Sequence, residues 1–184
     1  MFQEKITVII KELNQVLAKV DEEQVAAFIG AILQARKIVV VGAGRVGMAA
    51  RSFAQRLGHL GLSAYMLGDA TVPGIGAGDL LIVASGSGET QTIFDLVAIA
   101  KRNQSAIALV TGNKDSRMGQ LADTIVEIKA PSKTKPVKDL ISIQPMTTLN
   151  EQSLWLFFDA VVLCLMNKMK ENHETMWQRH SNLE

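Results

Sequence analysis

One short segment of the chain combines residue types that suit the binding of a phosphate group. An apolar run at residues 80–84 stops at the turn of residues 85–90, which reads SGSGET, and a helix is predicted over residues 89–101. Backbone N–H groups and hydroxyls in such a turn can converge on one anion beside the positive N-terminus of the helix. A generic flexible loop has the same composition, but a helix follows this turn directly, so we favour a phosphate site. The residues expected to hold the phosphate, or to let the backbone approach it, are Ser85, Gly86, Ser87, Gly88 and Thr90.

A second glycine-rich turn, residues 42–47, reads GAGRVG and lies between a predicted strand and a predicted helix. Its spacing is that of a dinucleotide-binding fingerprint, and Asp69 lies about 20 residues further on, as a ribose-binding acid would. The chain is too short for a dinucleotide domain together with a substrate domain, and a nucleotide leaves the other turn unexplained. We therefore favour two turns that grip one phosphosugar, with Gly44 and Arg45 near the ligand, and keep nucleotide binding as the alternative.

Alternating apolar patterns supply the scaffold for these motifs. Apolar runs bounded by glycine turns and separated by helical segments indicate a parallel sheet that helices cover on both faces. We therefore predict an α/β fold, a three-layer αβα sandwich with a five-stranded parallel sheet and right-handed crossovers. Strands are expected at residues 37–41, 63–67, 80–84, 106–110 and 124–128, and helices at residues 6–20, 21–33, 45–59, 89–101, 116–121 and 147–170.

The length of 184 residues suits one domain. Within residues 1–184 we expect N-terminal helices at 1–35, an α/β core at 36–128, a loop at 129–146, and a C-terminal helix and tail at 147–184. The tail holds a tryptophan, which a disordered tail rarely keeps, so it is expected to dock. The loop is interpreted as a solvated basic segment, or alternatively as a lid over an anionic ligand. Its lysines are Lys129, Lys133, Lys135 and Lys138.

Composition excludes several classes of function. The formal net charge of +1 gives no global field that would attract nucleic acid or an acidic membrane. The single cysteine, Cys164, rules out an internal disulfide and is expected in the core. We see no apolar run long enough to span a membrane and no signal peptide, so a cytoplasmic protein is expected. The histidines at positions 59, 173 and 180 are too scattered to suggest a metal site.

Several motifs together resemble one protein family. The SGSGET turn looks like the signature of the sugar isomerase (SIS) domain, and the likeness covers nearly the whole chain. The resemblance implies a flavodoxin-like fold, a homotetramer and no cofactor. It also implies conversion of 3-hexulose 6-phosphate to fructose 6-phosphate in the ribulose monophosphate route of formaldehyde fixation. The segments similar to the 6-phospho-3-hexuloisomerase family are residues 42–45, 53–61, 78–82, 142–146, 151–152 and 179–184.

The resemblance also implies catalytic roles. The isomerisation needs a carboxylate that moves a proton between neighbouring carbons through an enediol, and the likeness places this base on Glu151. His59 and His180 are expected to assist, and His180 could complete the site of a neighbouring subunit. Each residue also has an ordinary explanation. Glu151 suits the first turn of a helix, His59 suits the end of one, and His180 is a residue of the tail.

The chain departs from the family pattern near the expected site. Val46 stands in place of a serine, Ala70 and Val72 replace hydroxyl residues, and Thr147 and Asn150 replace a glycine and an aromatic residue. An apolar group opposite a polyol leaves a hydroxyl unpaired, at a cost of about 1–3 kcal/mol. The alternatives are therefore an isomerase of a different sugar phosphate, or a non-catalytic phosphosugar sensor, in which the carboxylate at position 151 would have no task.

Overall fold

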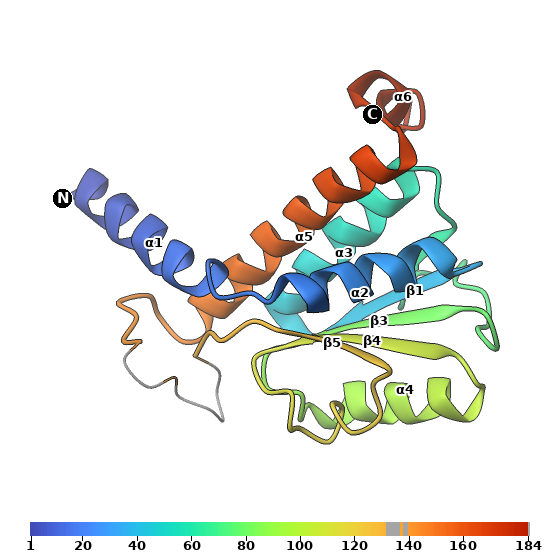
Figure 1. Ribbon diagram of the computed structural model, residues 1–184, viewed down its shortest axis with the longest axis horizontal. Coiled ribbons are helices and arrows are strands. Elements are labelled where there is room, and N and C mark those ends of the chain that lie inside the picture. The colour runs from blue at the N-terminus through green and yellow to red at the C-terminus, as the bar shows by residue number, and fades with distance from the viewer. Residues whose placement is uncertain (132–136, 138–139, 184) are drawn as a thin grey trace.

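The structure is a computed structural model, and it describes residues 1–131, 137 and 140–183. Two helices come first, strands and helices then alternate, and a long helix follows near the C-terminus (Figure 1). The predicted elements, apart from one short helix, are confirmed with shifts of a few residues at their ends. The elements are α1 (Phe2–Leu17), α2 (Glu22–Gln34), β1 (Ile38–Gly42), α3 (Gly44–His59), β2 (Ala64–Met66), β3 (Leu80–Ser85), α4 (Gln91–Arg102), β4 (Ala106–Thr111), β5 (Thr124–Glu127), α5 (Thr148–Met169) and α6 (His173–Trp177).

The five strands form one parallel sheet in the order β2-β1-β3-β4-β5. All residues of β3 are buried, as expected of a central strand that helices cover on both faces. The strand order is flavodoxin-like. From β1 the chain adds β2 on one side and β3, β4 and β5 on the other, so the topological switch point lies between β1 and β3. The predicted fold class is confirmed. Ligands of such sheets bind outside the carboxyl ends of the strands at this switch point.

Helices cover the two faces of the sheet unequally. The helices α2 and α3 lie on one face with α5 packed over them, and α4 covers the other face (Figure 1). Aromatic packing joins the thicker side, because the Phe53 ring of α3 stacks on the Phe158 ring of α5 with centroids 4.3 Å apart. Phe28 of α2 packs against Phe53 and Phe157. The first turns of α3 and α5 are thereby fixed relative to each other.

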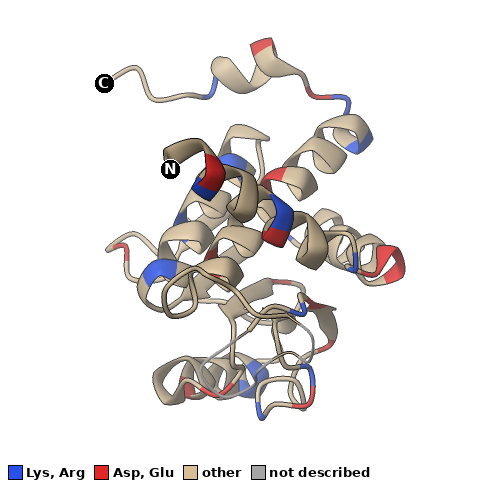
Figure 2. Cartoon of the chain, turned by 90° about the vertical axis from the view of Figure 1, so that its left-hand side faces the viewer, with Lys and Arg blue, Asp and Glu red and all other residues tan. Residues whose placement is uncertain are grey.

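The helix α1 projects from this body and leaves its N-terminal end free (Figure 1). Phe2 and Ile10 are 71% and 61% exposed, whereas Val16 near the other end of the helix is buried in the core. Figure 2 looks onto this side of the molecule and shows Lys and Arg interspersed with Asp and Glu. The free end of α1 therefore offers apolar side chains without a charge of one dominant sign.

Two predictions about local structure are wrong. Residues 116–121 form turns rather than a helix, and the N–H of Met118 donates to the carbonyl of Gly88, 3.3 Å away, in the SGSGET turn. The N–H of Met118 therefore bonds to a distant part of the chain and not to a carbonyl one helical turn earlier. Cys164, expected in the core, is exposed. It lies on the outer side of α5 because Val161 and Leu165 occupy the inward side.

The helix α5 also corrects the expectation that no apolar run could span a membrane. By length and composition alone α5 reaches that threshold, with a mean hydropathy of 1.3 over its most apolar stretch. Half of that stretch (50%) is buried inside the domain, where Leu154, Phe158 and Val162 belong to the main core. A core helix of a soluble protein passes the same test, so the length of α5 is weak evidence for a membrane span.

Candidate functional site

The two glycine-rich turns lie side by side at the carboxyl ends of β1 and β3, where Gly42 pairs with Ala84. Gly47 in the first turn of α3 packs directly on β1, because a Cβ there would lie 2.6 Å from the carbonyl oxygen of Gly42. The glycine spacing is therefore explained by helix–strand packing. Asp69, the acid expected to bind a ribose, instead forms an ion pair with Arg51 at 2.6 Å. Neither feature now points specifically to a nucleotide.

The two turns and the start of α5 enclose a cavity of about 380 Å³. This volume lies near the lower end of the range of small-molecule sites, about 300–1,000 Å³. The cavity brings together parts of the chain that are more than 100 residues apart in sequence. Its lining residues are Ala43, Gly44, Arg45, Val46, Gly86, Ser87, Thr90, Met146, Thr147, Asn150 and Glu151.

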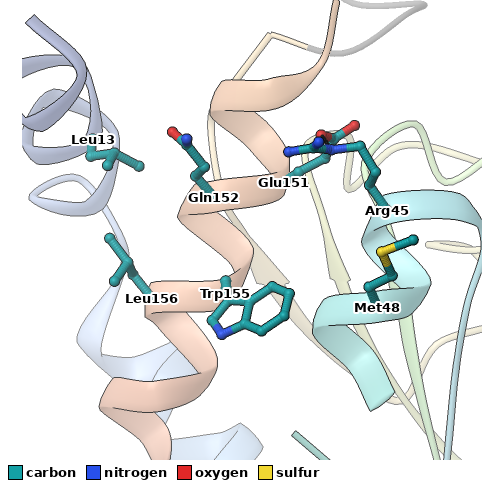
Figure 3. A pocket seen from close by; sticks show the side chains of 7 residues that line it. All are labelled: Leu13, Arg45, Met48, Glu151, Gln152, Trp155 and Leu156. Carbon is teal, nitrogen blue, oxygen red and sulfur yellow. Dashed lines mark hydrogen bonds and ion pairs between the residues drawn. The ribbon is translucent and has the colours of Figure 1, made fainter. Parts of the chain in front are cut away.

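Glu151 lies at one side of this cavity with both carboxylate oxygens engaged. Arg45 Nε lies 2.5 Å from Oε2, and the hydroxyl of Thr147 donates to Oε1 at 2.7 Å. Figure 3 shows Arg45 reaching from α3 toward Glu151 on α5. This ion pair explains an arginine in the first turn of α3, where the helix dipole disfavours a cation. The carboxylate is 12% exposed and held in a fixed orientation, which suits proton transfer to a ligand.

The residues of the SGSGET turn divide into two groups. Gly86, Ser87 and Thr90 line the cavity, whereas Ser85 and Gly88 lie behind this lining and shape the turn. Ser85 Oγ accepts the N–H of Gly88 at 3.2 Å, and Gly88 has a φ of +67°, which favours glycine. Thr90 is the N-cap residue of α4 and its side chain makes no capping hydrogen bond, so the N–H groups of Gln91 and Thr92 have no helical acceptor. Free N–H groups, hydroxyls and a positive helix end together suit an anion.

A buried carboxylate on α1 holds the loop that leads into α5. Glu12 is 5% exposed, and its oxygens accept hydrogen bonds from Ser142 Oγ (2.7 Å), the Ile143 N–H (2.9 Å) and Gln144 Nε2 (2.9 Å). Burial acts to raise the pKa of Glu12, but these hydrogen bonds outweigh it and hold the pKa below its ordinary value. Sequence reasoning missed this residue. Its only sequence signal is a charged residue beside the apolar positions Ile9, Leu13 and Val16 of the helix predicted at residues 6–20.

Comparison with known proteins agrees with this arrangement. The SIS domain profile matches residues 31–156. The chain is 39% identical over 181 residues to the 3-hexulose-6-phosphate isomerase of Bacillus subtilis (strain 168), and the alignment covers 98% of each protein. The chain belongs to the 3-hexulose-6-phosphate isomerase family of SIS domain proteins. The enzyme of that name from Mycobacterium gastri is 41% identical over 179 residues, covering 97% of this chain and 89% of that protein.

Solved structures agree with the assignment to the SIS family. A crystal structure of a hypothetical protein from Methanococcus jannaschii, for which a 3-hexulose-6-phosphate isomerase function was inferred, has a TM-score of 0.85 and 27% identity. The match covers 98% of this chain and 99% of that one. The family resemblance predicted from the sequence is confirmed.

Two of the predicted catalytic residues, His59 and His180, lie far from Glu151. His59 ends α3, and its ring lies 5.2 Å from the ring of His180 in the tail, measured between centroids. Both line a second cavity of about 450 Å³ together with Trp177. The length of α3 places about 21 Å between Arg45 and His59, at a rise of 1.5 Å per residue. One copy of the chain therefore does not bring the histidines to the carboxylate.

The tail that carries His180 is anchored on the end of α3, which confirms the expectation that the tail docks. Arg179 Nη1 donates to the carbonyl of His59 at 3.0 Å and to the carboxylate of Glu171 at 2.9 Å. The Trp177 ring stacks on the His180 ring with centroids 4.8 Å apart. Trp177 is nevertheless 64% exposed, so one side of this aromatic cluster faces outward.

The departures from the SIS family pattern fall in two places. Val46, Thr147 and Asn150 line the main cavity, and the Asn150 amide lies against Gly86, where a Cβ would be 2.6 Å from Oδ1. Val72, by contrast, packs against the hydrophobic cluster on the α4 side of the sheet. Ala70 is exposed and lies outside the lining of the cavity. Of these departures, the first three are therefore the ones that line the cavity.

The remaining predictions concern metals and the basic loop. Among the described residues, no group of three or more His, Cys, Asp or Glu side chains could hold a metal ion. Lys129 lies 4.0 Å from the carboxylate of Glu127. The other lysines of the predicted lid, Lys133, Lys135 and Lys138, lie outside the described residues.

Proposed function

We propose that the chain interconverts 3-hexulose 6-phosphate and fructose 6-phosphate, with Glu151 as the catalytic base. The observation that carries this proposal is the cavity itself. It has an anion-binding turn on one side and an oriented carboxylate on the other, in a chain of the 3-hexulose-6-phosphate isomerase family. The phosphate would bind at Gly86, Ser87 and Thr90, with Ser85 and Gly88 shaping the turn. The carbonyl end of the sugar would then face Glu151.

The reaction follows from the chemistry of the two sugars. In the 3-hexulose the carbonyl is at C3, and Glu151 removes the proton from C2 while O3 gains a proton, which gives an enediol. O2 then loses its proton as the C2 carbonyl forms, and Glu151 returns its proton to C3. Arg45 lies beside the base and is placed to stabilise negative charge on the enediol oxygens. Gly44 lets the backbone approach the same end of the sugar.

We also propose a homotetramer in which His59 and His180 of one copy assist Glu151 of another. An apolar groove of about 470 Å³ runs between α1, α3 and α5, and Leu13, Met48, Trp155 and Leu156 line it (Figure 3). Met48 is 62% exposed and Trp155 is 42% exposed, so both favour burial by a partner. A second copy seated there would lie next to Glu151.

Further proposals follow from the family. We infer that residues 1–184 act as one SIS domain in the cytoplasm, without a cofactor or a metal, and that the reaction belongs to the ribulose monophosphate route. The ligand is a small phosphosugar, and nucleic acid and membrane are not partners. Three residues of the cavity lining, Val46, Thr147 and Asn150, differ from the family pattern. A different sugar phosphate is therefore the alternative substrate.

Proton exchange in heavy water tests the proposed function directly. Fructose 6-phosphate incubated with the wild-type chain should gain deuterium, and a panel of other sugar phosphates ranks the substrates. Glu151→Gln should bind the same sugar phosphate and exchange at least about 1,000-fold more slowly, within the range of general acid–base catalysis. The matched control is Glu23→Gln on the exposed surface of α2.

Two outcomes would contradict the proposal. Wild-type protein that binds phosphosugars without any exchange would be a sensor. Near-normal exchange by Glu151→Gln would remove the base from that position.

A further inference from the structure

Glu89 is an unexpected residue in a turn that is built for an anion. It lies between Gly88 and Thr90, and the neighbouring residues Ser87 and Thr90 line the cavity. A carboxylate that pointed into this site would repel a phosphate, because like charges a few ångströms apart interact unfavourably even near water. The turn therefore needs a device that keeps this negative charge away from the ligand.

Arg117 donates three hydrogen bonds to Glu89. The backbone N–H of Arg117 donates to Glu89 Oε1 at 2.8 Å, Nε donates to Oε2 at 2.7 Å, and Nη2 donates to the Glu89 carbonyl at 3.0 Å. Nη1 donates to Gln91 Oε1 at 3.0 Å, and the guanidinium lies over the Phe94 ring, 4.5 Å from its centroid. The hydrogen bonds from Arg117 hold the pKa of Glu89 below its ordinary value, so the carboxylate is ionised and paired.

The segment that carries Arg117 also supports the turn from behind. Ser116 lies so close to Gly88 that a Cβ at Gly88 would be 2.0 Å from its hydroxyl oxygen. The N–H of Met118 donates to the Gly88 carbonyl at 3.3 Å, and the N–H of Gly112 donates to the Gly86 carbonyl at 3.0 Å. Residues 112–118 therefore back the turn, and Arg117 is the charged residue of this segment that donates hydrogen bonds to Glu89.

We infer that Arg117 is a positioning residue of the proposed phosphate site, which draws the Glu89 carboxylate away from the ligand and fixes the turn around it. The inference rests on the proposed function, since it assumes that the turn binds the phosphate of a phosphosugar. The sequence gives no sign of this role, because it predicts a short helix at residues 116–121 with no link to the turn. The charge argument gives this role a signature that a structural role alone would not have.

The test compares Arg117→Met, Glu89→Gln and the double variant, with Arg102→Met at the exposed end of α4 as the control. Binding of fructose 6-phosphate and of inorganic phosphate is measured by calorimetry, and kcat and KM are measured with the sugar. Arg117→Met frees the carboxylate and should weaken both Kd values by about 10-fold or more, while kcat stays within about 3-fold because the Glu151 side is untouched. In the double variant no carboxylate remains, so most of the affinity should return.

Three results would overturn the inference. Arg117→Met could bind phosphate as well as Arg102→Met does, the double variant could stay as weak as the single one, or Glu89→Gln alone could weaken binding as much as Arg117→Met. Should Arg117→Met fail to fold, Arg117→Lys serves instead. This variant keeps the positive charge but loses the planar guanidinium with its several donors, and it should weaken phosphate binding by about 3-fold. A wild-type chain that binds no sugar phosphate at all would sink the proposed function itself, which separates the two failures.

Discussion

The two ends of α3 carry different parts of the chemistry that the proposed reaction needs. At the N-terminal end, Arg45 and the two glycine turns meet Glu151 in a polar cavity. At the C-terminal end, the His180 ring stacks on Trp177 and lies beside the ring of His59 in an aromatic cluster. The helix holds these ends about 21 Å apart by its rise per residue. A single copy therefore keeps Glu151 apart from the two histidines, and the proposed homotetramer is what would bring them together.

The helix dipole supports this division. The N-terminal end of a helix favours anions, and the C-terminal end favours cations such as a protonated histidine. The phosphate turn lies at the N-terminus of α4 and beside that of α3, whereas His59 is the last residue of α3. The proposed anion site and the proposed proton-donating imidazole would thus each lie at a helix end whose dipole favours it, at opposite ends of α3.

The largest effects are expected from substitutions at each end of α3, tested first separately and then as a mixture of the two variants. His59→Asn should lower turnover by about 100-fold and leave the Kd for fructose 6-phosphate nearly unchanged. His173→Asn, a change in the same aromatic cluster, serves as the control. Mixing His59→Asn with Glu151→Gln after subunit exchange should restore measurable turnover, because some mixed assemblies regain one intact site. Turnover that stays absent in the mixture would mean that the two ends act within one chain or that the histidine is not used.

A smaller effect is expected from the hydroxyl that orients the base. Thr147→Val keeps the shape of the side chain but removes the hydrogen bond to Glu151 Oε1, and should lower kcat by about 5-fold with little change in KM. Thr147→Ser keeps the hydroxyl and should behave as wild type. Equal activity of the Val and Ser variants would show that Arg45 alone orients the carboxylate.

The smallest effect concerns the pH dependence of stability at the Glu151 end. The pKa of Glu12 is lower in the folded chain than in the unfolded chain. Its contribution is therefore complete above the ordinary glutamate pKa and is lost as the pH falls through the lowered folded-state value. Glu12→Gln should lower the free energy of unfolding by about 1–3 kcal/mol at pH 7, and this deficit should shrink in acid. Urea unfolding of both proteins from pH 7 to pH 3 measures it, and a deficit that does not change with pH would contradict the assignment.

The sequence predicted the fold well because its signals are local. The glycine turns and the apolar strands, together with the periodicity of α3 and α5, are each visible within about 15 residues. The turn at residues 85–90 was found in the same way. The contacts of Glu12 with the loop before α5, of Arg117 with Glu89, and of Arg45 with Glu151 join residues far apart in the chain. No periodicity encodes such pairs, so only the folded chain shows them.

The helix wrongly predicted at residues 116–121 also shows that long-range contacts cannot be read from local sequence. Its composition permits a helix, but Met118 and Ser116 are engaged by the turn at Gly88 instead. A tertiary partner outweighed a weak local preference. The error hid Arg117, because a solvent-facing helical arginine needs no explanation.

The bonds between Glu12 and residues 142–144 also bear on how the chain acquires its site during synthesis. They close a loop of about 130 residues, and contacts of such separation form late, since the entropy of closing the loop must be offset first. Glu12 leaves the ribosome about 130 residues before its partners do. We therefore expect the segment that leads into α5, and Glu151 with it, to take its place only after this loop of about 130 residues has closed.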